Sequence, residues 1–368
     1  MSLLEDGQRI RNTYQVERFL GQGAFAEVYR VRHRFLGRQA MKVFKRIGTI
    51  EETEQMLGEA ILLSQIGHPN IVRVFDADTV STSAGQRGFF TMEYVAGGSL
   101  ESFWVSHRDR FVPVESTVRI LGQLCEGLAV AHSEKPPIIH RDITPQNILV
   151  GYDTSGLRAR VSDFGLAKRT DPLTELASTR GTLAFKAPES LRNMQSDSCA
   201  GDVWAIGTIA YLLLTDTLPY EDPGGSSKSF FGSHHRTPPV SPRRFNSEVD
   251  ESLERIVLQA LDPDPKSRTP DAGALARELT GWQLQRRQQQ FKNGVDLPSQ
   301  TSKTVLGVPS PEDEGEARRM AAQALLLSRQ ASALQEAADL MEEAFNKSPG
   351  LRGDHEHKLR LWRKGVVT

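Results

Sequence analysis

The stretch "IIHRDITPQNILV" occupies residues 138–150 and places polar side chains between two apolar runs. Asp142 and Asn147 stand five residues apart in it, and Asp163 opens a "DFG" triplet further along. Two side chains that can bind Mg²⁺, together with a carboxylate that can accept a hydroxyl proton, are what phosphoryl transfer requires. The stretch therefore predicts a site for this chemistry.

A glycine-rich segment precedes it in the chain. "GQGAFAEV", from Gly21 to Val28, lies between two strand-like runs. Most glycine pairs of this kind are simple turns, but a glycine-rich hairpin can also bring backbone N–H groups close to a polyphosphate without Cβ clashes. A dinucleotide-binding turn would need a helix after it, whereas a second strand follows here.

The next strand-like run, "QAMKV", carries Lys42 between two apolar residues, so its side chain points to the opposite face of the strand. A solvated lysine is the ordinary alternative. Glu59, in the helical pattern that follows, offers the ammonium group a partner. Such a pair can hold the ammonium against the α- and β-phosphates of a nucleotide.

"HRD" at 140–142, "DFG" at 163–165 and "APE" at 187–189 follow one another in this order. With the glycine-rich segment and Lys42, the chain resembles eukaryotic-type (Hanks-type) protein kinases of the Ser/Thr branch from about Tyr14 to Trp282. The resemblance implies an α+β bilobal fold. We expect an antiparallel sheet and one helix over about 14–95, and a mainly helical lobe over about 96–282.

The resemblance also implies site roles, with ATP and Mg²⁺ as cofactors. Asp142 would be the catalytic base, and Lys42 would pair with Glu59. Asn147 and Asp163 would hold Mg²⁺. Met92 would be the gatekeeper, Glu93 to Val95 the adenine hinge, and Ala26 would take the third glycine position. The implied nucleotide contacts are Leu20, Gly21, Gln22, Gly23, Val28, Ala40, Lys42, Glu59, Met92, Glu93, Val95, Leu149 and Asp163.

Further residues would support the site. The resemblance implies a buried pair of Glu189 with Arg268, and an anchoring of the "HRD" backbone by Asp202. Arg141 would receive a phosphate on the activation loop. The candidate acceptors of that phosphate are Thr170, Thr174, Ser178 and Thr179, of which we favour the last two from their distance before "APE".

Three positions depart from the family pattern: Ala26, Phe185 and Thr144. Thr144 matters most, because a lysine is usual there, and losing a preorganised cation costs roughly 2.7–4 kcal/mol. No other part is missing, so an active kinase that autophosphorylates and takes part in signalling is favoured over a nucleotide-binding pseudokinase scaffold. A small-molecule phosphotransferase is the third alternative, but Thr182 and Pro188 belong to a segment that indicates protein substrates with Ser or Thr acceptors.

The patterns predict the remaining organisation. Strands are expected within 14–45, 71–80 and 88–95, and helices at 51–67, 115–134, 200–215, 251–261 and 271–282. Residues 283–315 are polar and predict a linker. Residues 316–366 predict a helical tail that weakly resembles one tetratricopeptide pair. A 3.6-residue apolar stripe runs through it, formed by Leu334, Ala337, Met341, Ala344 and Phe345. Plain helical packing is slightly favoured over docking on the kinase or on a partner.

The composition excludes several classes. A net charge of −1, from 45 basic and 46 acidic residues, gives no basic field for nucleic acid or anionic lipid. Two cysteines in apolar surroundings predict reduced thiols. The N-terminus shows no signal-peptide pattern, and the longest apolar run, residues 205–214, is about half the length that spans a bilayer. We therefore expect a cytoplasmic protein.

Overall fold

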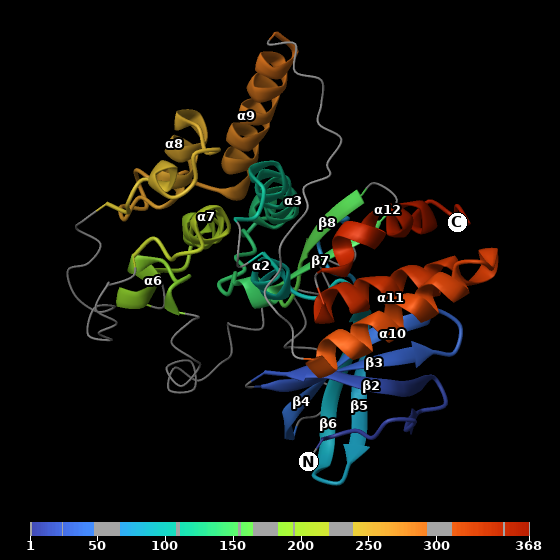
Figure 1. Ribbon diagram of the computed structural model, residues 1–368. Coiled ribbons are helices and arrows are strands. Elements are labelled where there is room, and N and C mark those ends of the chain that lie inside the picture. The colour runs from blue at the N-terminus through green and yellow to red at the C-terminus, as the bar shows by residue number, and fades with distance from the viewer. Residues whose placement is uncertain are drawn as a thin grey trace. The chain divides into compact units, whose positions relative to one another are not determined.

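The structure, a computed structural model, describes residues 2–23, 25–47, 67–107, 111–153, 156–164, 183–193, 196–220, 238–292, 311–348 and 350–367. The chain divides into two compact units (Figure 1). Unit 1 comprises the described residues up to Tyr94 together with residues 162–164. Unit 2 comprises residues 95–161 and the described residues from 183 onward.

Unit 1 is built on a six-stranded antiparallel sheet in the order β1-β2-β3-β4-β6-β5. The expected strands are confirmed, and β1 is an additional short strand that pairs with the start of β2. Residues 51–66 of the expected helix at 51–67, Glu59 among them, lie outside the described residues. The strands are β1 (Arg9–Ile10), β2 (Tyr14–Gln22), β3 (Ala26–His33), β4 (Gly37–Ile47), β5 (Val74–Thr82) and β6 (Gly85–Glu93).

One face of this sheet forms the core of unit 1. Tyr29, Val31, Met41, Val43 and Phe89 are completely buried there. Each such side chain contributes about 1.5–3 kcal/mol by leaving water. Because side chains alternate along a strand, the residues between them on β4 point to the opposite face, which is the face the sequence assigns to the nucleotide.

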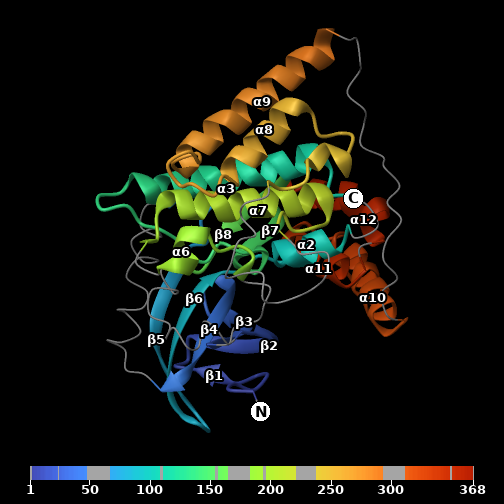
Figure 2. The same ribbon diagram turned by 90° about the vertical axis from the view of Figure 1, so that its left-hand side faces the viewer.

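Unit 2 is mainly helical, with one β-hairpin. Helices α3 and α7 lie side by side at its centre (Figure 2). Its elements are α2 (Leu100–Val105), α3 (Val114–Ser133), η1 (Pro145–Asn147), β7 (Ile148–Asp153), β8 (Gly156–Val161), α6 (Pro188–Arg192), α7 (Cys199–Thr215), η5 (Pro242–Arg244), α8 (Glu251–Ala260) and α9 (Ala272–Lys292). The expected helices within 115–134, 200–215, 251–261 and 271–282 are confirmed.

Helix α7 organises this core. Every residue from 202 to 215 is buried, as expected of a helix that is apolar on all sides. The Ser198 hydroxyl oxygen accepts a hydrogen bond from the Gly201 N–H and caps the N-terminus, and Asp216 ends the helix in the left-handed conformation. Among the described residues, no helix combines the length and apolar character needed to cross a membrane. Both cysteines are free, and Cys125 is fully buried.

The range 283–315 differs from the expected linker at both ends. Helix α9 continues to Lys292, and α10 (Pro311–Leu327) begins before residue 316. The segment "QLQRRQQQ" consists of good helix formers and contains no glycine or proline, so α9 has no local reason to end at Trp282. Residues 293–310 lie outside the described part of the chain.

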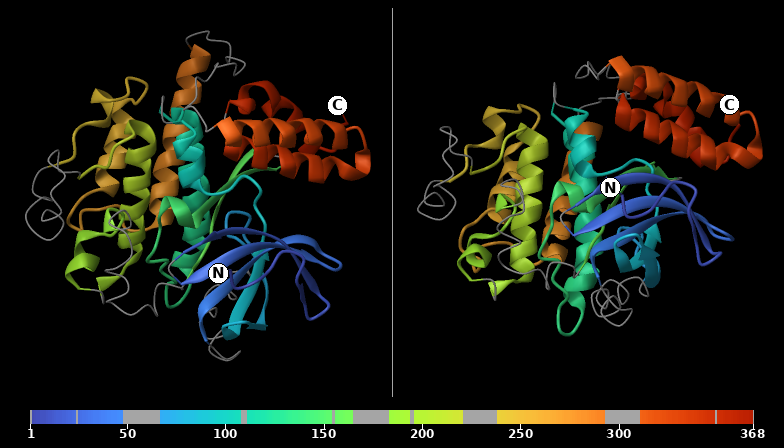
Figure 3. Two further views of the ribbon diagram at one scale, coloured as in Figure 1. Left: turned by 60° about the horizontal axis from the view of Figure 1, so that its bottom comes forward. Right: turned by 90° about the horizontal axis from the view of Figure 1, so that it is seen from below.

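The tail consists of α10, the 3₁₀ turn η6 (Ala331–Ala333), α11 (Leu334–Lys347) and α12 (Leu351–Arg363), which pack together (Figure 3). The expected apolar stripe of α11 is confirmed as buried. Trp362 and Leu359 of α12 complete this small core. The tail belongs to unit 2, and its described residues are 311–348 and 350–367.

Candidate active site

In unit 1, four expected nucleotide contacts share one face of the sheet. Val28 lies opposite Lys42 in the pairing of β3 with β4, and Ala40 lies opposite Met92 in the pairing of β4 with β6. Directly opposed residues, and residues two apart on a strand, project to the same side. The register therefore places Lys42 in an apolar surrounding near Met92, the expected gatekeeper.

Lys42 forms an ion pair with Asp163. Its Nζ lies 2.7 Å from Oδ1 of Asp163, and the two side chains are 16% and 17% exposed. Asp163 adopts a left-handed backbone conformation (φ 63°), which aspartate tolerates better than most residues. The expected partner Glu59 lies outside the described residues, and sequence reasoning did not anticipate a direct pair between Lys42 and Asp163.

The glycine-rich turn joins β2 to β3 as a hairpin. Gly21 pairs with Val28, and the Gly23 N–H donates to the Ala26 carbonyl over 2.9 Å. A Cβ atom at Gly21 or Gly23 would have no described atom within 4 Å, and neither glycine has a positive φ. No described contact therefore requires glycine at these two positions. Because glycine has no side chain, the backbone at both positions is open to an approaching group.

In unit 2, the "HRD" loop brings Asp142 and Asn147 together. The Asn147 Nδ2 donates to the Asp142 carbonyl oxygen and to its Oδ2, each over 2.8 Å. The 3₁₀ turn η1 makes this possible, because it folds residues 145–147 back toward Asp142. The amide thus holds the carboxylate in one orientation. Asp142 and Asn147 belong to unit 2, whereas Lys42 and Asp163 belong to unit 1.

Thr144 is only 4% exposed and begins the η1 turn. Its carbonyl oxygen accepts the Asn147 N–H over 3.0 Å. The residue that departs most from the family pattern is therefore packed within the loop, and the turn that presents Asn147 is formed with threonine in this position.

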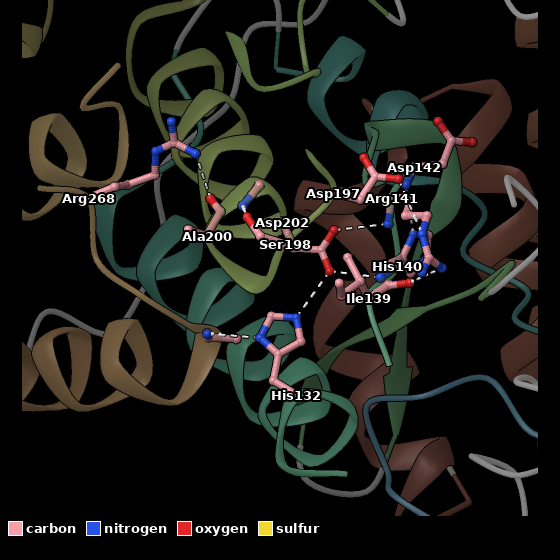
Figure 4. Close-up of polar contacts among 12 residues, drawn as sticks. His132, Ile139, His140, Arg141, Asp142, Asp197, Ser198, Ala200, Asp202 and Arg268 are labelled. Atoms are coloured by element: carbon pink, nitrogen blue, oxygen red, sulfur yellow. Dashed lines mark hydrogen bonds and ion pairs between the residues drawn. The ribbon is translucent and has the colours of Figure 1, made fainter. Parts of the chain in front are cut away.

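Asp202 of α7 holds the backbone of this loop (Figure 4). Its two carboxylate oxygens accept the N–H groups of His140, over 2.8 Å, and of Arg141, over 3.0 Å. Arg141 has a positive φ of 70°, so its conformation needs such support. The anchoring role that the resemblance implied for Asp202 matches these contacts.

His132 of α3 supplies a further donor to Asp202, over 3.0 Å from its Nε2. The Ala272 N–H donates to the Nδ1 of His132, so Nε2 carries the ring proton. Burial alone would raise the pKa of Asp202, but the hydrogen bonds from His132 and from the His140 N–H outweigh it and lower the pKa. The carboxylate is therefore ionised at neutral pH.

Glu189 and Arg268 form the second expected support. Nη1 of Arg268 lies 2.7 Å from Oε1 of Glu189, and Nη2 lies 3.0 Å from Oε2, which is a bidentate geometry. The same guanidinium donates to the Ala200 carbonyl and lies 5.0 Å from the ring centre of Trp204. These contacts join α6 and α7 to the segment after α8 and are structural.

Arg141, the residue expected to receive a phosphate, forms an ion pair with Asp197. Its Nε lies 3.3 Å from Oδ2 of Asp197. Lys186 donates to the Arg141 carbonyl over 3.0 Å. Sequence reasoning missed Asp197, Lys186 and His132, and only the position of Asp197 shortly before the "DVW" stretch could have pointed to it. The expected phosphate acceptors and Thr182 lie outside the described residues.

The backbone after the expected hinge is fastened to β7. The Val150 N–H donates to the Gly98 carbonyl over 2.9 Å, and Ser99 forms a β-bridge with Leu149. The two expected adenine contacts of unit 2, Val95 and Leu149, thus stand on two segments that are hydrogen-bonded to each other.

The two expected metal ligands each carry an oxygen donor, Asp163 in unit 1 and Asn147 in unit 2. Oxygen is the ligand type that hard divalent cations prefer, and Mg²⁺ sites in phosphotransferases use one or two carboxylates plus substrate phosphates. In the described part of the chain, no three His, Cys, Asp or Glu side chains gather around a metal position.

Comparison with known families decides the assignment. The family described as "Protein kinase domain" matches residues 14–279. The chain belongs to the protein kinase family. Its kinase domain includes every site residue discussed above, and the tail from residue 311 onward lies outside the match.

Relatives of this kinase domain include bacterial proteins named serine/threonine-protein kinases. The chain is 32% identical over 294 residues to pkn3 of Myxococcus xanthus, an alignment that covers 76% of this chain and 52% of that protein. It is 34% identical over 274 residues to Pkn1 of the same organism, covering 73% of this chain and 38% of that protein. The chain thus spans about half or less of the length of these relatives.

A solved structure shows the same fold. A point mutant of the Mycobacterium tuberculosis PknI kinase domain aligns with a TM-score of 0.55 and 22% sequence identity. The alignment covers 76% of this chain and 99% of that one. The expected protein kinase fold, with an antiparallel sheet followed by helices, is confirmed.

Proposed function

We propose that this chain is an ATP- and Mg²⁺-dependent Ser/Thr protein kinase that phosphorylates protein hydroxyls, including its own. The observation that carries the proposal is the ion pair of 2.7 Å between Lys42 and Asp163, two motif residues 121 positions apart. A decayed site would have no reason to keep a half-buried ammonium beside a carboxylate on the face of the sheet that faces away from the core.

Each unit contributes defined tasks. In unit 1, Lys42 would bind the α- and β-phosphates of ATP, and the open backbone at Gly21 and Gly23 would cover the phosphates. Ala40 and Met92, buried side by side on the same face, would line the adenine position. These tasks are positional, because phosphoryl transfer depends mainly on orientation and on neutralising charge.

In unit 2, Asp142 would accept the proton of the substrate hydroxyl. The hydroxyl oxygen then forms the new bond to the γ-phosphorus, the bond from this phosphorus to the β,γ-bridging oxygen breaks, and ADP leaves with that oxygen. Asn147 supports the step, since its amide fixes the carboxylate through the 2.8 Å bond to Oδ2. Because the carboxylate is already held in one orientation, it loses less conformational entropy when it meets the substrate hydroxyl.

Asn147 and Asp163 would hold Mg²⁺, which when bound supplies positive charge beside the transferring phosphoryl group. Their oxygen donors fit this ion. Thr144 does not replace the cation of a lysine, so we expect phosphoryl transfer to be slower than with lysine, and not absent.

We further propose residues 14–282 as the catalytic domain and the segment after it as an accessory tail. The cytoplasm is the proposed location, because ATP is supplied there and the two free cysteines suit a reducing compartment. The bacterial relatives named Ser/Thr kinases support Ser and Thr as acceptors.

The experiment is transfer of ³²P from γ-labelled ATP to the protein itself and to a basic test protein. Asp142→Asn should lower the initial rate at least about a hundredfold by removing the base. Asp6→Asn, the same substitution at an exposed turn, is the matched control and should label like wild type. Equal labelling by the Asp142→Asn variant would reject the proposal, and nucleotide binding without turnover would indicate a scaffold.

A further inference from the structure

Two side chains of the tail bind backbone groups beside the nucleotide segments of unit 2. The Asn346 Nδ2 donates to the Ala96 carbonyl over 3.1 Å, and Oε1 of Glu342 accepts the Tyr152 N–H over 3.2 Å. Ala96 directly follows Val95 of the expected hinge. Tyr152 lies three residues after Leu149 on β7. Both bonds join residues at least 190 positions apart in the sequence.

These two backbone segments are themselves joined, as the Gly98–Val150 hydrogen bond and the Ser99–Leu149 bridge show. The tail therefore contacts both strands of one small β-ladder, which residues 98–99 and 149–150 form. Asn346 holds the side that follows the hinge, and Glu342 holds the side that carries Leu149. A displacement of the tail would free both sides at once.

The packing around Glu342 depends on glycines. A Cβ atom at Gly97 would lie 2.2 Å from the Val150 carbonyl oxygen and 2.9 Å from Oε2 of Glu342, distances that real Cβ atoms do not show. A Cβ atom at Gly151 would be crowded at 3.1 Å from the same Oε2. Glycine at these two positions therefore lets the ladder and the Glu342 carboxylate meet.

The carboxylate is kept buried by a cation of the tail itself. Glu342 is 2% exposed, and its Oε1 lies 2.8 Å from Nη2 of Arg363. Arg363 also binds Asp339, over 2.8 Å. A buried carboxyl group is costly unless its oxygens are hydrogen-bonded, and in the docked tail Oε1 of Glu342 is bonded both to Arg363 and to the Tyr152 N–H.

Arg352 strengthens the same contact. Its guanidinium lies 5.2–5.8 Å from the ring centres of Phe103, Tyr152 and Phe345, which come from α2, β7 and α11. Its Nη1 also donates to the Tyr152 hydroxyl over 3.2 Å. Cation–π contacts of this kind join the tail to the domain by side chains as well as by the backbone.

We infer that the tail is part of the nucleotide site, with Glu342 and Asn346 as positioning residues that hold the hinge end and β7 in the geometry that binds adenine. The inference rests on the proposed function, because it takes the nucleotide to lie against Val95 and Leu149. It predicts that loosening the tail weakens nucleotide binding without slowing the chemical step.

The test uses the full chain and two measurements: the Kd for ADP by calorimetry, and kcat and KM for ATP. Glu342→Ala removes the acceptor of the Tyr152 N–H and should weaken ADP binding about fivefold, the equivalent of one net hydrogen bond. KM for ATP should rise by a similar factor, while kcat at saturating ATP stays within twofold of wild type. Asn346→Asp removes the amide donor and should have a smaller effect in the same direction.

Two further variants separate positioning from packing. Glu342→Gln keeps an oxygen that can accept the Tyr152 N–H and should restore most of the affinity for ADP. Glu314→Gln breaks an exposed ion pair with Arg318 on α10 and should bind ADP like wild type. Wild-type affinity in both the Glu342→Ala and the Asn346→Asp variant would overturn the inference.

The outcomes also separate this inference from the proposed function. If wild type binds ADP and the variants bind it more weakly, but neither wild type nor any variant transfers phosphate, the inference stands and the proposed kinase function is rejected. If wild type transfers phosphate and the variants have unchanged Kd, only the inference falls. A wild-type protein that binds no nucleotide would overturn both.

Discussion

Asp202 in the kinase domain and Glu342 in the tail are both buried carboxylates that hold a distant backbone segment, but they are stabilised differently. Each is a carboxylate 2% exposed that accepts a backbone N–H from a distant segment. Asp202 receives two backbone N–H groups and the His132 ring N–H. Glu342 receives the Tyr152 N–H and two N–H groups of one guanidinium, Nε and Nη2 of Arg363, all three on Oε1. It shares this guanidinium with Asp339.

The difference appears in their acidity. Burial would raise both pKa values, but the donors around Asp202 outweigh burial and lower its pKa. Burial dominates at Glu342 and raises its pKa, because Arg363 offsets only part of the cost and Asp339 adds negative charge nearby. Three N–H groups reach each carboxylate, so the number of donors does not separate them. The donors of Asp202 are spread over both oxygens, whereas those of Glu342 meet on Oε1 and Asp339 lies nearby. We therefore expect Asp202 to be the secure anchor of the catalytic loop and Glu342 to be the releasable anchor of the tail.

The largest expected effect tests the secure anchor. Asp202→Ala leaves the N–H groups of His140 and Arg141 and the His132 ring without their acceptor, and should lower the free energy of unfolding by about 3–5 kcal/mol. Urea unfolding followed by circular dichroism measures this. A loss below that of the Glu342→Ala variant would show that the ranking of the two anchors is wrong.

The releasable anchor should give a local effect. Glu342→Ala should lower the free energy of tail opening by about 1–3 kcal/mol, the cost of an unsatisfied buried group, and leave the rest of the domain folded. Hydrogen exchange should accelerate in α11 and α12 but not in α7. Uniform acceleration in all three helices would contradict a separable tail.

The two anchors should respond to pH with opposite slopes. The folded pKa of Asp202 lies below its ordinary value of 3.8, so its stabilisation is present above pH 3.8 and is lost as the pH falls through the lowered value. The folded pKa of Glu342 lies above 4.5, so proton-linked stabilisation of the docked tail is complete below pH 4.5 and is lost as the pH rises through the raised value.

The pH dependence of tail opening predicted for Glu342 can be measured from the hydrogen-exchange rates of α11 amides. These rates are corrected for the intrinsic pH dependence of amide exchange. Glu342→Gln should flatten it, since the amide does not titrate. A tail that opens more readily as the pH falls from neutrality toward pH 4.5 would contradict the sign derived for Glu342.

The smallest effect is expected at an exposed pair. Glu314→Gln breaks the ion pair with Arg318, whose side chains are 38% and 70% exposed. Such a helical i,i+4 pair contributes about 0.3–0.5 kcal/mol, so tail exchange and the urea midpoint should barely change. A change as large as that in the Glu342→Ala variant would mean that tail docking does not depend on the buried carboxylate.

Local patterns predicted most of the fold. Alternation found the main strands of the sheet, as with Met41 and Val43 around Lys42, and the 3.6-residue stripe found α11. Composition was misleading after Trp282, because polar glutamines and arginines continue a helix as well as they form a linker. The pair of Glu189 with Arg268 could be predicted because both residues belong to recognisable motifs, and the structure confirms it.

Other contacts could not be predicted, for a physical reason. Glu342 stands in "DLMEEAF", where a helical pattern gives no sign that this acidic residue is buried against β7. Glu342 is buried because α11 packs against a strand that lies 190 residues earlier in the sequence. The periodicity of a single helix does not reveal which distant segment it contacts. The direct pair of Lys42 with Asp163 depends on a similar long-range contact.

The ring contacts of Arg352 have a practical consequence for anyone who shortens this protein. A chain cut after Lys292, near the end of the kinase match, would lose the Arg352 guanidinium that lies over the rings of Phe103 and Tyr152. Two aromatic rings would then face water beside the hinge. Such a fragment should self-associate at high concentration, and its affinity for inhibitors of the adenine site should differ from that of the full chain.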